Sequence, residues 1–261
     1  MKTDSDNLPS LRRDTADYVA SAVKAIVGAA PFAGSLLVEI AGNIIPNQRM
    51  ERVVKYAKEL EGRLAGLDQE FVKSQLTNEN FTDLMEEGIR QAARSLSDER
   101  RGYLASAIAN GISSEDVEFF ESKHLLRILG EINDVEVIIL RFYLVYAFPG
   151  DEEYREKHKA ILRAKPMVHG DPTSLFDKNT LHGSYKEHLA SIALLDREYE
   201  VERELGLLDI DIFTKGPKVR GYHITSFGKL LLRHIGLSDE HDRPLAEAGL
   251  AAIHSATTED N

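Results

Sequence analysis

Cysteine is absent from the 261 residues of the chain. The absence excludes disulfide bonds, thiolate catalysis and zinc or iron–sulfur centres held by cysteine. It also fits a reducing compartment. The acidic N-terminal sequence MKTDSDNLPSLRRDTADY lacks the positive region of a secretory signal. The sequence therefore predicts a cytoplasmic protein.

Positive charge is scarce as well. Lysine and arginine together number 32 against 43 aspartates and glutamates, which gives a formal net charge of −11. This balance disfavours nonspecific binding to nucleic acid or to an anionic bilayer, unless positive charge gathers locally. Hydrophobic residues make up 43% of the chain, an ordinary share for a globular protein long enough to bury a core.

Familiar catalytic motifs are also missing. The chain has no G-x-S-x-G nucleophile elbow, no G-x-x-x-x-G-K-[ST] phosphate loop and no G-x-G-x-x-G after a strand. His169, His182 and His188 lie near Asp171 and Asp177, but the spacing of these histidines matches no zinc motif. We therefore expect a non-enzymatic protein without cofactor, metal or small-molecule substrate. An active site made of carboxylates that converge only on folding stays an alternative.

Helical periodicity dominates the sequence between residues 18 and 235. Apolar residues recur every three or four positions in 50–67 and in 79–96, with charged residues on the opposite face. The nearly apolar stretch 135–148 is too short to span a bilayer and predicts a buried core helix, with a strand pair as the alternative.

The C-terminal part changes its period. The stretch 184–206 is helix-periodic, 209–214 alternates like a strand, 215–221 is turn-like, and 222–225 predicts a returning strand before a last helix at 226–236. The predicted fold is mainly α, a multi-helix N-terminal assembly followed by a winged-helix-like α+β module with a short β-hairpin. The predicted regions are a flexible N-terminus at 1–17, a helical domain at 18–165 with a Gly/Ala-rich hairpin at 18–46, a loop or linker at 166–180, the winged-helix-like module at 181–236 and a flexible tail at 237–261.

The segment 205–235 resembles the end of winged helix-turn-helix domains. In those domains a leucine-threonine-proline-hydrophobic-glycine stretch opens the last helix. Here the stretch reads Ile224, Thr225, Ser226, Phe227 and Gly228, with serine in place of proline. The resemblance covers about an eighth of the chain and implies a winged-helix fold for it. The whole chain also resembles uncharacterised bacterial helical proteins that join a Gly/Ala-rich N-terminal segment to such a module, and this resemblance implies no activity.

Basic residues gather in the predicted turn of this module. We expect Lys215, Lys218 and Arg220 to contact a partner, as charges that position it and not as readers of bases. The helical stretch before the turn is acidic, and acidic side chains would be repelled by the phosphates of a DNA groove. A protein partner is therefore the leading prediction, with nucleic acid as the alternative. The acidic residues are Glu187, Asp196, Glu198, Glu200, Glu202, Glu204 and, just beyond, Asp209.

An apolar passage of small residues lies near the N-terminus, KAIVGAAPFAGSLLVEIAGNIIP at 24–46. Only fourteen uncharged residues separate Lys24 from Glu39, fewer than the roughly 20 that a spanning helix needs. Pro31 predicts a break between two short helices whose small residues allow close backbone contact. We expect a buried or self-associating hairpin, with membrane contact as the alternative. The residues expected to matter there are Gly28, Pro31, Gly34 and Gly42.

Together these features predict a non-enzymatic bacterial interaction or regulatory protein. Its module would bind a macromolecular partner, a protein in preference to DNA, and its N-terminal hairpin would support assembly into an oligomer. The alternative is a membrane-acting effector of bacterial stress or phage defence that inserts the hairpin into a bilayer.

Overall fold

The computed structural model describes most of the chain between residues 20 and 237. The predicted flexible N-terminus, the predicted tail apart from Leu237, and residues 145–148 of the apolar stretch lie outside this part. The described residues are 20–21, 23–28, 30–31, 33–44, 49–113, 119–144, 152–162, 173–201, 208–211 and 215–237.

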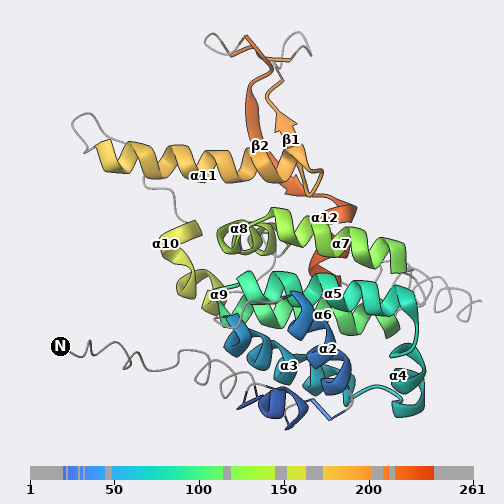
Figure 1. Cartoon of the computed structure of the whole chain (residues 1–261). Helices are drawn as coiled ribbons and strands as arrows, with labels where there is room; N and C mark the ends of the chain where they lie inside the picture. The colour runs from blue at the N-terminus through green and yellow to red at the C-terminus, as the bar shows by residue number, and fades with distance from the viewer. Residues whose placement is uncertain are drawn as a thin grey trace, which may run out of the picture.

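Helices make up most of the described chain, and one antiparallel hairpin lies near its C-terminal end, which confirms the predicted mainly α fold with a short β-hairpin (Figure 1). The elements are α2 (Gly34–Ile44), α3 (Met50–Leu64), α4 (Gln69–Gln75), α5 (Glu79–Arg94), α6 (Asp98–Ser113), α7 (Phe119–Glu131), α8 (Asp134–Leu144), α9 (Glu152–Lys157), α10 (Lys159–Leu162), α11 (Thr173–Ser191), β1 (Leu195–Tyr199), β2 (Val219–Ile224) and α12 (Ser226–His234).

The long helices of the body form where the sequence carries apolar stripes. On α5 the buried side chains of Phe81, Met85 and Ile89 follow one another at four-residue intervals, so one face of the helix enters the core. At the start of α6 the Oγ of Ser97 accepts the N–H of Arg100 at 3.0 Å, so Ser97 caps this helix.

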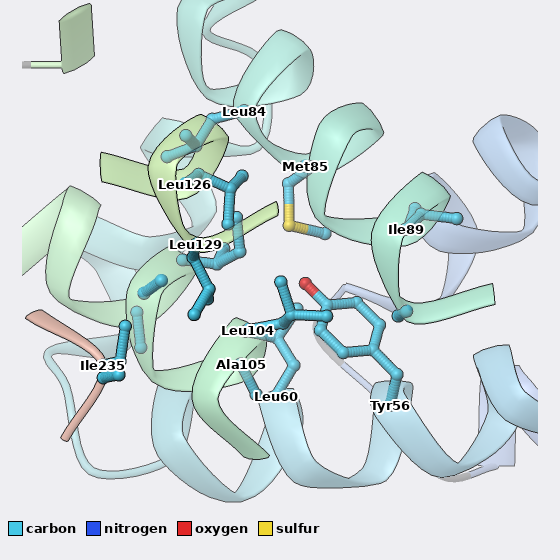
Figure 2. Packing of buried hydrophobic residues seen from close by; sticks show 14 of the residues in the cluster. Tyr56, Leu60, Leu84, Met85, Ile89, Leu104, Ala105, Leu126, Leu129 and Ile235 are labelled. Atoms are coloured by element: carbon cyan, nitrogen blue, oxygen red, sulfur yellow. The ribbon is translucent and has the colours of Figure 1, made fainter. Parts of the chain in front are cut away.

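The core lies where α3, α5, α6 and α7 meet, and Ile235, directly after α12, packs into it from the C-terminal side (Figure 2). The amide of Asn110 on α6 donates to the carbonyl of His234 at 2.8 Å. The last helix therefore completes the core that the N-terminal helices begin. Labelled core residues are Tyr56, Leu60, Leu84, Met85, Ile89, Leu104, Ala105, Leu126, Leu129 and Ile235.

The apolar stretch that follows α7 is helical over its described part, Asp134–Leu144. This confirms the predicted helix and excludes the strand pair there. Val137, Ile139 and Leu140 are buried. The helix α8 contacts both α11 and β2, because the hairpin and its preceding helix lie over it.

Two boundaries in the C-terminal part differ from the prediction. The helix α11 begins at Thr173, inside the stretch 166–180 that was predicted as a loop, and it ends at Ser191, well before the predicted end at Gly206. The first strand of the hairpin is β1, not the stretch 209–214, and β1 occupies residues that were predicted as helix. The predicted returning strand at 222–225 is correct over Tyr222–Ile224, which belong to β2.

The early end of α11 has a local cause. Ala193 has a φ of 62°, the left-handed conformation that commonly ends a helix. The N–H of Leu194 donates to the carbonyl of Leu189 at 3.0 Å, and the N–H of Ala193 donates to that of Ala190 at 3.2 Å. These two bonds form a Schellman motif, in which glycine is the usual left-handed residue. Because alanine stands there, the sequence carries no glycine stop signal.

The motif that opens α12 joins this helix to the end of α11. The Oγ1 of Thr225 accepts the N–H of Gly228 at 2.9 Å and donates to the carbonyl of Ala193 at 2.7 Å. A Cβ on Gly228 would lie 2.3 Å from the carbonyl oxygen of Leu194. Threonine caps the helix, and glycine admits the neighbouring backbone, which explains both residues of the motif physically.

Candidate functional site

The strands β1 and β2 form a two-stranded ribbon that projects from the helical body beyond α11 (Figure 1). One face of the ribbon lies against α11, and we call it the inner face. There Glu187 on α11 accepts Arg197 Nη2 at 2.8 Å and the hydroxyl of Tyr222. The hydrogen bond from Tyr222, and then that from Arg197, hold the pKa of the Glu187 carboxyl below its usual range. These contacts fix the base of the ribbon to α11.

The opposite face of the ribbon, the outer face, carries a ladder of ion pairs. Successive side chains of a strand point to opposite sides, so alternate residues of β1 share this face. The pairs lie at 3.6 Å between His223 Nε2 and Asp196 Oδ2, at 3.3 Å between Arg220 Nη1 and Glu198 Oε1, and at 2.5 Å between Lys218 Nζ and Glu200 Oε2.

A bulge explains how Arg220 joins this face. Glu198 lies opposite Gly221 in the register and Tyr199 lies opposite Val219, so that Arg220 is an extra residue on β2. In a bulge the extra residue re-aims its side chain relative to regular alternation. Here it brings the guanidinium to the side of Glu198.

Above the ribbon, three residues form a junction. The N–H of Glu200 donates to the carbonyl of Lys218 at 2.8 Å, that of Lys218 donates to Asp209 at 2.8 Å, and that of Asp209 donates back to Glu200 at 2.9 Å. Two of these residues are also joined by their side chains, because Lys218 Nζ lies 3.7 Å from Asp209 Oδ2. Its hydrogen bond to Glu200 and the Glu200 charge raise the pKa of Lys218. Beyond this junction the described residues form two isolated β-bridges.

One bridge pairs Val201 with Leu208, and the other pairs Ile210 with Pro217. The exposed fractions of these apolar side chains are large, 53% for Val201, 48% for Leu208 and 50% for Ile210, with 37% for Tyr199 just below the junction. We call these four residues the tip. Strand alternation places Tyr199 and Val201 on the side of the inner face, beyond the reach of α11.

The structure shows the surroundings of the three basic residues that the sequence analysis selected as partner contacts. Lys218 and Arg220 lie on the outer face, each paired with carboxylates. Lys215 has a φ of 59° and donates its N–H to Asp211 at 2.9 Å, but its side chain pairs with no residue that the structure describes. The acidic residues predicted on a preceding helix instead belong partly to β1, where they are the partners of these cations.

The predicted break in the N-terminal hairpin is present. A helical segment at 23–28 is followed by a turn that includes Pro31, and α2 begins at Gly34. A Cβ on Gly34 would lie 2.9 Å from the Cα of Val27, so the two segments touch backbone to backbone. Gly28 and Pro31 are exposed, and Gly42 lies in α2.

The apolar face of this hairpin belongs to the core of the body. The buried residues of the hairpin are Ile26, Ala30, Ala33, Leu37, Ile40 and Ala41, and α2 contacts both α3 and α5. Among the helices that the structure describes, none combines the length and the apolar character that crossing a bilayer requires.

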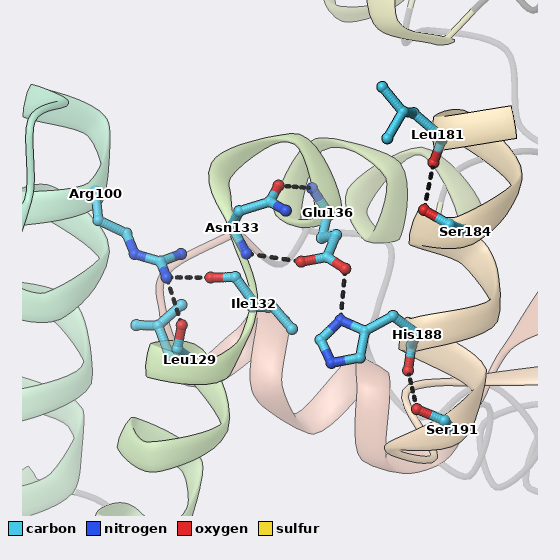
Figure 3. A network of polar contacts seen from close by, with 9 residues as sticks. All are labelled: Arg100, Leu129, Ile132, Asn133, Glu136, Leu181, Ser184, His188 and Ser191. Atoms are coloured by element: carbon cyan, nitrogen blue, oxygen red, sulfur yellow. Dashed lines mark hydrogen bonds and ion pairs between the residues drawn. The ribbon is translucent and has the colours of Figure 1, made fainter. Parts of the chain in front are cut away.

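A buried carboxylate that the sequence reading missed joins α8 to α11 (Figure 3). The Oε2 of Glu136 accepts the N–H of Asn133 at 2.8 Å, and Asn133 Oδ1 accepts the N–H of Glu136 at 3.0 Å. The other oxygen, Oε1, lies 2.6 Å from His188 Nδ1. The first pair is a capping box, whose N-x-x-E spacing is visible in the sequence. The contact with His188 has no local signal.

The histidines considered as metal ligands do not gather. His169 and Asp171 lie outside the described residues, His188 contacts Glu136, and burial with the nearby Lys186 charge lowers the pKa of His182. Within the described part of the chain, no three histidine or acidic side chains lie close enough together to hold a metal ion.

Comparison of the chain with protein-family models, with curated proteins and with solved structures found no match. Its function is therefore inferred from the residues and their geometry.

Proposed function

We propose that this chain is a non-enzymatic bacterial interaction protein with a regulatory role, and that its C-terminal module presents the tip to a protein partner. The order α11, β1, β2, α12 supports placing this module with winged-helix domains. In this proposal the ribbon is a rigid arm, since its base is held by Glu187 and its far end by the junction.

The observation that carries the proposal is the exposure of apolar side chains at the far end of the arm. Val201, Leu208 and Ile210 are each about half exposed. Val201 is bridged to Leu208, and Ile210 follows Leu208 two positions later, on the same side of an extended chain. Grouped and exposed apolar side chains favour a protein contact, where burial of apolar area supplies the binding energy. Isolated exposed residues, such as Leu96, need no such explanation.

The charge of the arm supports a protein in preference to nucleic acid. A phosphate-binding surface needs cations that are free to replace counterions. Lys218 and Arg220 are instead matched by the carboxylates of Glu200, Asp209 and Glu198. Carboxylates thus outnumber the cations on the outer face, and phosphate groups would have to displace its internal ion pairs.

A site-specific photocrosslinker tests the proposal in living cells of the source organism. Benzoylphenylalanine placed at Val201 should give a discrete crosslinked product, and the second change Leu208→Ser should abolish it, because the serine removes apolar contact area. The same probe at Leu96, which is 83% exposed on the body, is the matched control and should give no product that depends on Leu208. Equal products from both positions would contradict the proposal.

Labelled duplex DNA gives the second arm of the test. Fluorescence anisotropy should show no binding at low salt. Binding that weakens steeply with salt and disappears in a Lys218→Ala/Arg220→Ala variant would replace the protein partner with DNA.

A further inference from the structure

We propose that the outer face of the ribbon binds the outer face of a second copy of this chain, about a two-fold axis parallel to the ribbon. The inference extends the proposed function, because such a dimer carries two tips at the same end.

The outer face consists of two parallel rows of opposite charge. The carboxylate row follows β1 and the residue after it, and the cationic row follows β2 and the residue before it, one strand spacing or about 5 Å away. All six side chains are at least one-third exposed. The carboxylate row is Asp196, Glu198 and, directly after β1, Glu200; the cationic row is His223, Arg220 and, directly before β2, Lys218.

The symmetry of a dimer decides which rows meet. Two identical faces can approach each other about a two-fold axis that is either parallel or perpendicular to the strands. The parallel axis exchanges the two rows, so each carboxylate row faces the cationic row of the other copy. The perpendicular axis places carboxylates opposite carboxylates, which is repulsive. Charge complementarity therefore selects the parallel dimer, a closed arrangement of the kind most common among homo-oligomers.

The cations have the donors that such a dimer needs. Arg220 uses Nη1 towards Glu198 within its own chain, whereas a guanidinium has five N–H donors. An ammonium group has three, and Lys218 already shares its group between two carboxylates. Each cation is thus able to bridge a carboxylate of its own chain and one of the second copy, which turns isolated pairs into a network.

Position in the fold leaves this face available. The helices α11 and α8 contact β1 and β2 respectively. Glu187 of α11 binds Arg197, and Tyr143 of α8 packs against Tyr222, and both of these strand residues lie on the inner face. The ribbon projects beyond the helices (Figure 1). The parallel axis keeps both tips at the same end, with their apolar sides on opposite flanks of the pair.

The dimer also answers a question of size. Four partly exposed apolar side chains at one tip fall well short of the roughly 800 Å² per partner that a standard protein interface buries. Two tips held together double the available apolar surface and allow a partner to bind through both.

Sedimentation equilibrium of the purified full-length chain tests the dimer. Exposed ion pairs are individually weak and screened by salt. We therefore expect a dimer whose dissociation constant rises about tenfold or more between roughly 0.05 and 0.5 M NaCl. A chain that stays monomeric at high concentration and low salt would overturn the inference and leave the ladder as a solvated face.

Charge-swapped variants test the arrangement itself. Glu198→Lys/Glu200→Lys makes the outer face cationic, and Lys218→Glu/Arg220→Glu makes it anionic. Each variant alone should be monomeric, and an equimolar mixture should form the heterodimer. The chain with all four substitutions restores the 198–220 and 200–218 pairs within and between copies and loses only the contact of Lys218 with Asp209, so it should dimerise like the original chain. Circular dichroism checks that each variant is folded.

Matched controls separate this inference from the proposed function. Glu51→Lys changes the charge of an exposed residue on α3 and should leave the dimer unchanged. If the mixture stays monomeric while the Val201 crosslink persists, the dimer is wrong and the protein-binding tip stands. If the dimer forms and the crosslink is absent, only the proposed function fails.

Discussion

Glu136 on α8 and His188 on α11 are 52 positions apart in the chain, and Oε1 of the carboxylate lies 2.6 Å from Nδ1 of the imidazole. The side chain of Glu136 is only 3% exposed. Its second oxygen accepts the N–H of Asn133, so one carboxylate caps α8 and also holds α11. Because α11 carries the base of the ribbon, this contact determines where the arm sits on the body.

Removing this carboxylate should destabilise the protein. We expect Glu136→Ala to lower the free energy of unfolding by about 2–3 kcal/mol, because the N–H of Asn133 loses its acceptor and His188 loses its partner. Glu136→Gln keeps an oxygen acceptor and should cost about half as much. Urea denaturation measures both. Glu131→Ala, which removes a half-exposed carboxylate at the end of α7, is the control and should change the value by less than about 0.5 kcal/mol. Equal losses in Glu136→Ala and Glu131→Ala would contradict the role given to Glu136.

The end of α11 offers a stabilising change. Ala193 has a φ of 62°, which costs a side chain with a Cβ roughly 1 kcal/mol and costs glycine nothing. Ala193→Gly should therefore raise the free energy of unfolding by about 0.5–1 kcal/mol. Ala190→Gly, three residues earlier inside the helix, is the control and should lower it by about 1 kcal/mol. Chemical denaturation decides between them, and a loss in Ala193→Gly would show that the left-handed turn is not strained.

The helices of the body were predictable because their signal is local. The burial of Phe81 and Ile89 follows from their own segment, because apolar side chains repeat there every three or four positions. The break at Pro31 was predictable for the same reason. The capping box of Asn133 and Glu136 is equally local and was overlooked.

The arm was predicted less well because its signals are ambiguous or distant. With alanine at 193 in place of glycine, nothing in the sequence ended α11, and the helical reading ran on through β1. Asp196, Glu198 and Glu200 alternate as strand residues do, but their neighbours also fit a helix. The pairing of Arg220 depends on a bulge and on the register of two strands, which no single segment encodes. The basic residues were therefore found without their partners.

Two glycines of the N-terminal hairpin should respond in opposite ways to alanine. A Cβ on Gly34 would lie 2.9 Å from the Cα of Val27, a contact with backbone that cannot easily move, so Gly34→Ala should cost about 1–3 kcal/mol. A Cβ on Gly28 would meet no atom within 4 Å, and alanine favours the helical segment there. Gly28→Ala should be neutral or stabilise by up to about 1 kcal/mol. Thermal denaturation of both variants tests the close approach, and similar melting temperatures would disprove it.

Stability should fall on mild acidification because of His234. The side chain of this residue on α12 is buried, and burial lowers its pKa from 6.5 to about 4. Between these two values the unfolded chain binds a proton that the folded chain does not, so folding loses stability as the pH falls. The stability that depends on a neutral His234 is fully present above about pH 6.5 and is lost near pH 4. A pKa shift of this size corresponds to roughly 3 kcal/mol of unfolding free energy.

Substitution isolates this contribution from that of the other titrating groups. His234→Gln cannot titrate, so the slope of unfolding free energy against pH between about 4 and 6.5 should be shallower than in the original chain. His223→Gln, at an exposed histidine of the outer face, is the matched control for exchanging a histidine for glutamine. Urea denaturation across this pH window measures all three chains. The same slope in the original chain and in His234→Gln would mean that the buried imidazole does not link folding to pH, and that α12 enters the core without this sensitivity.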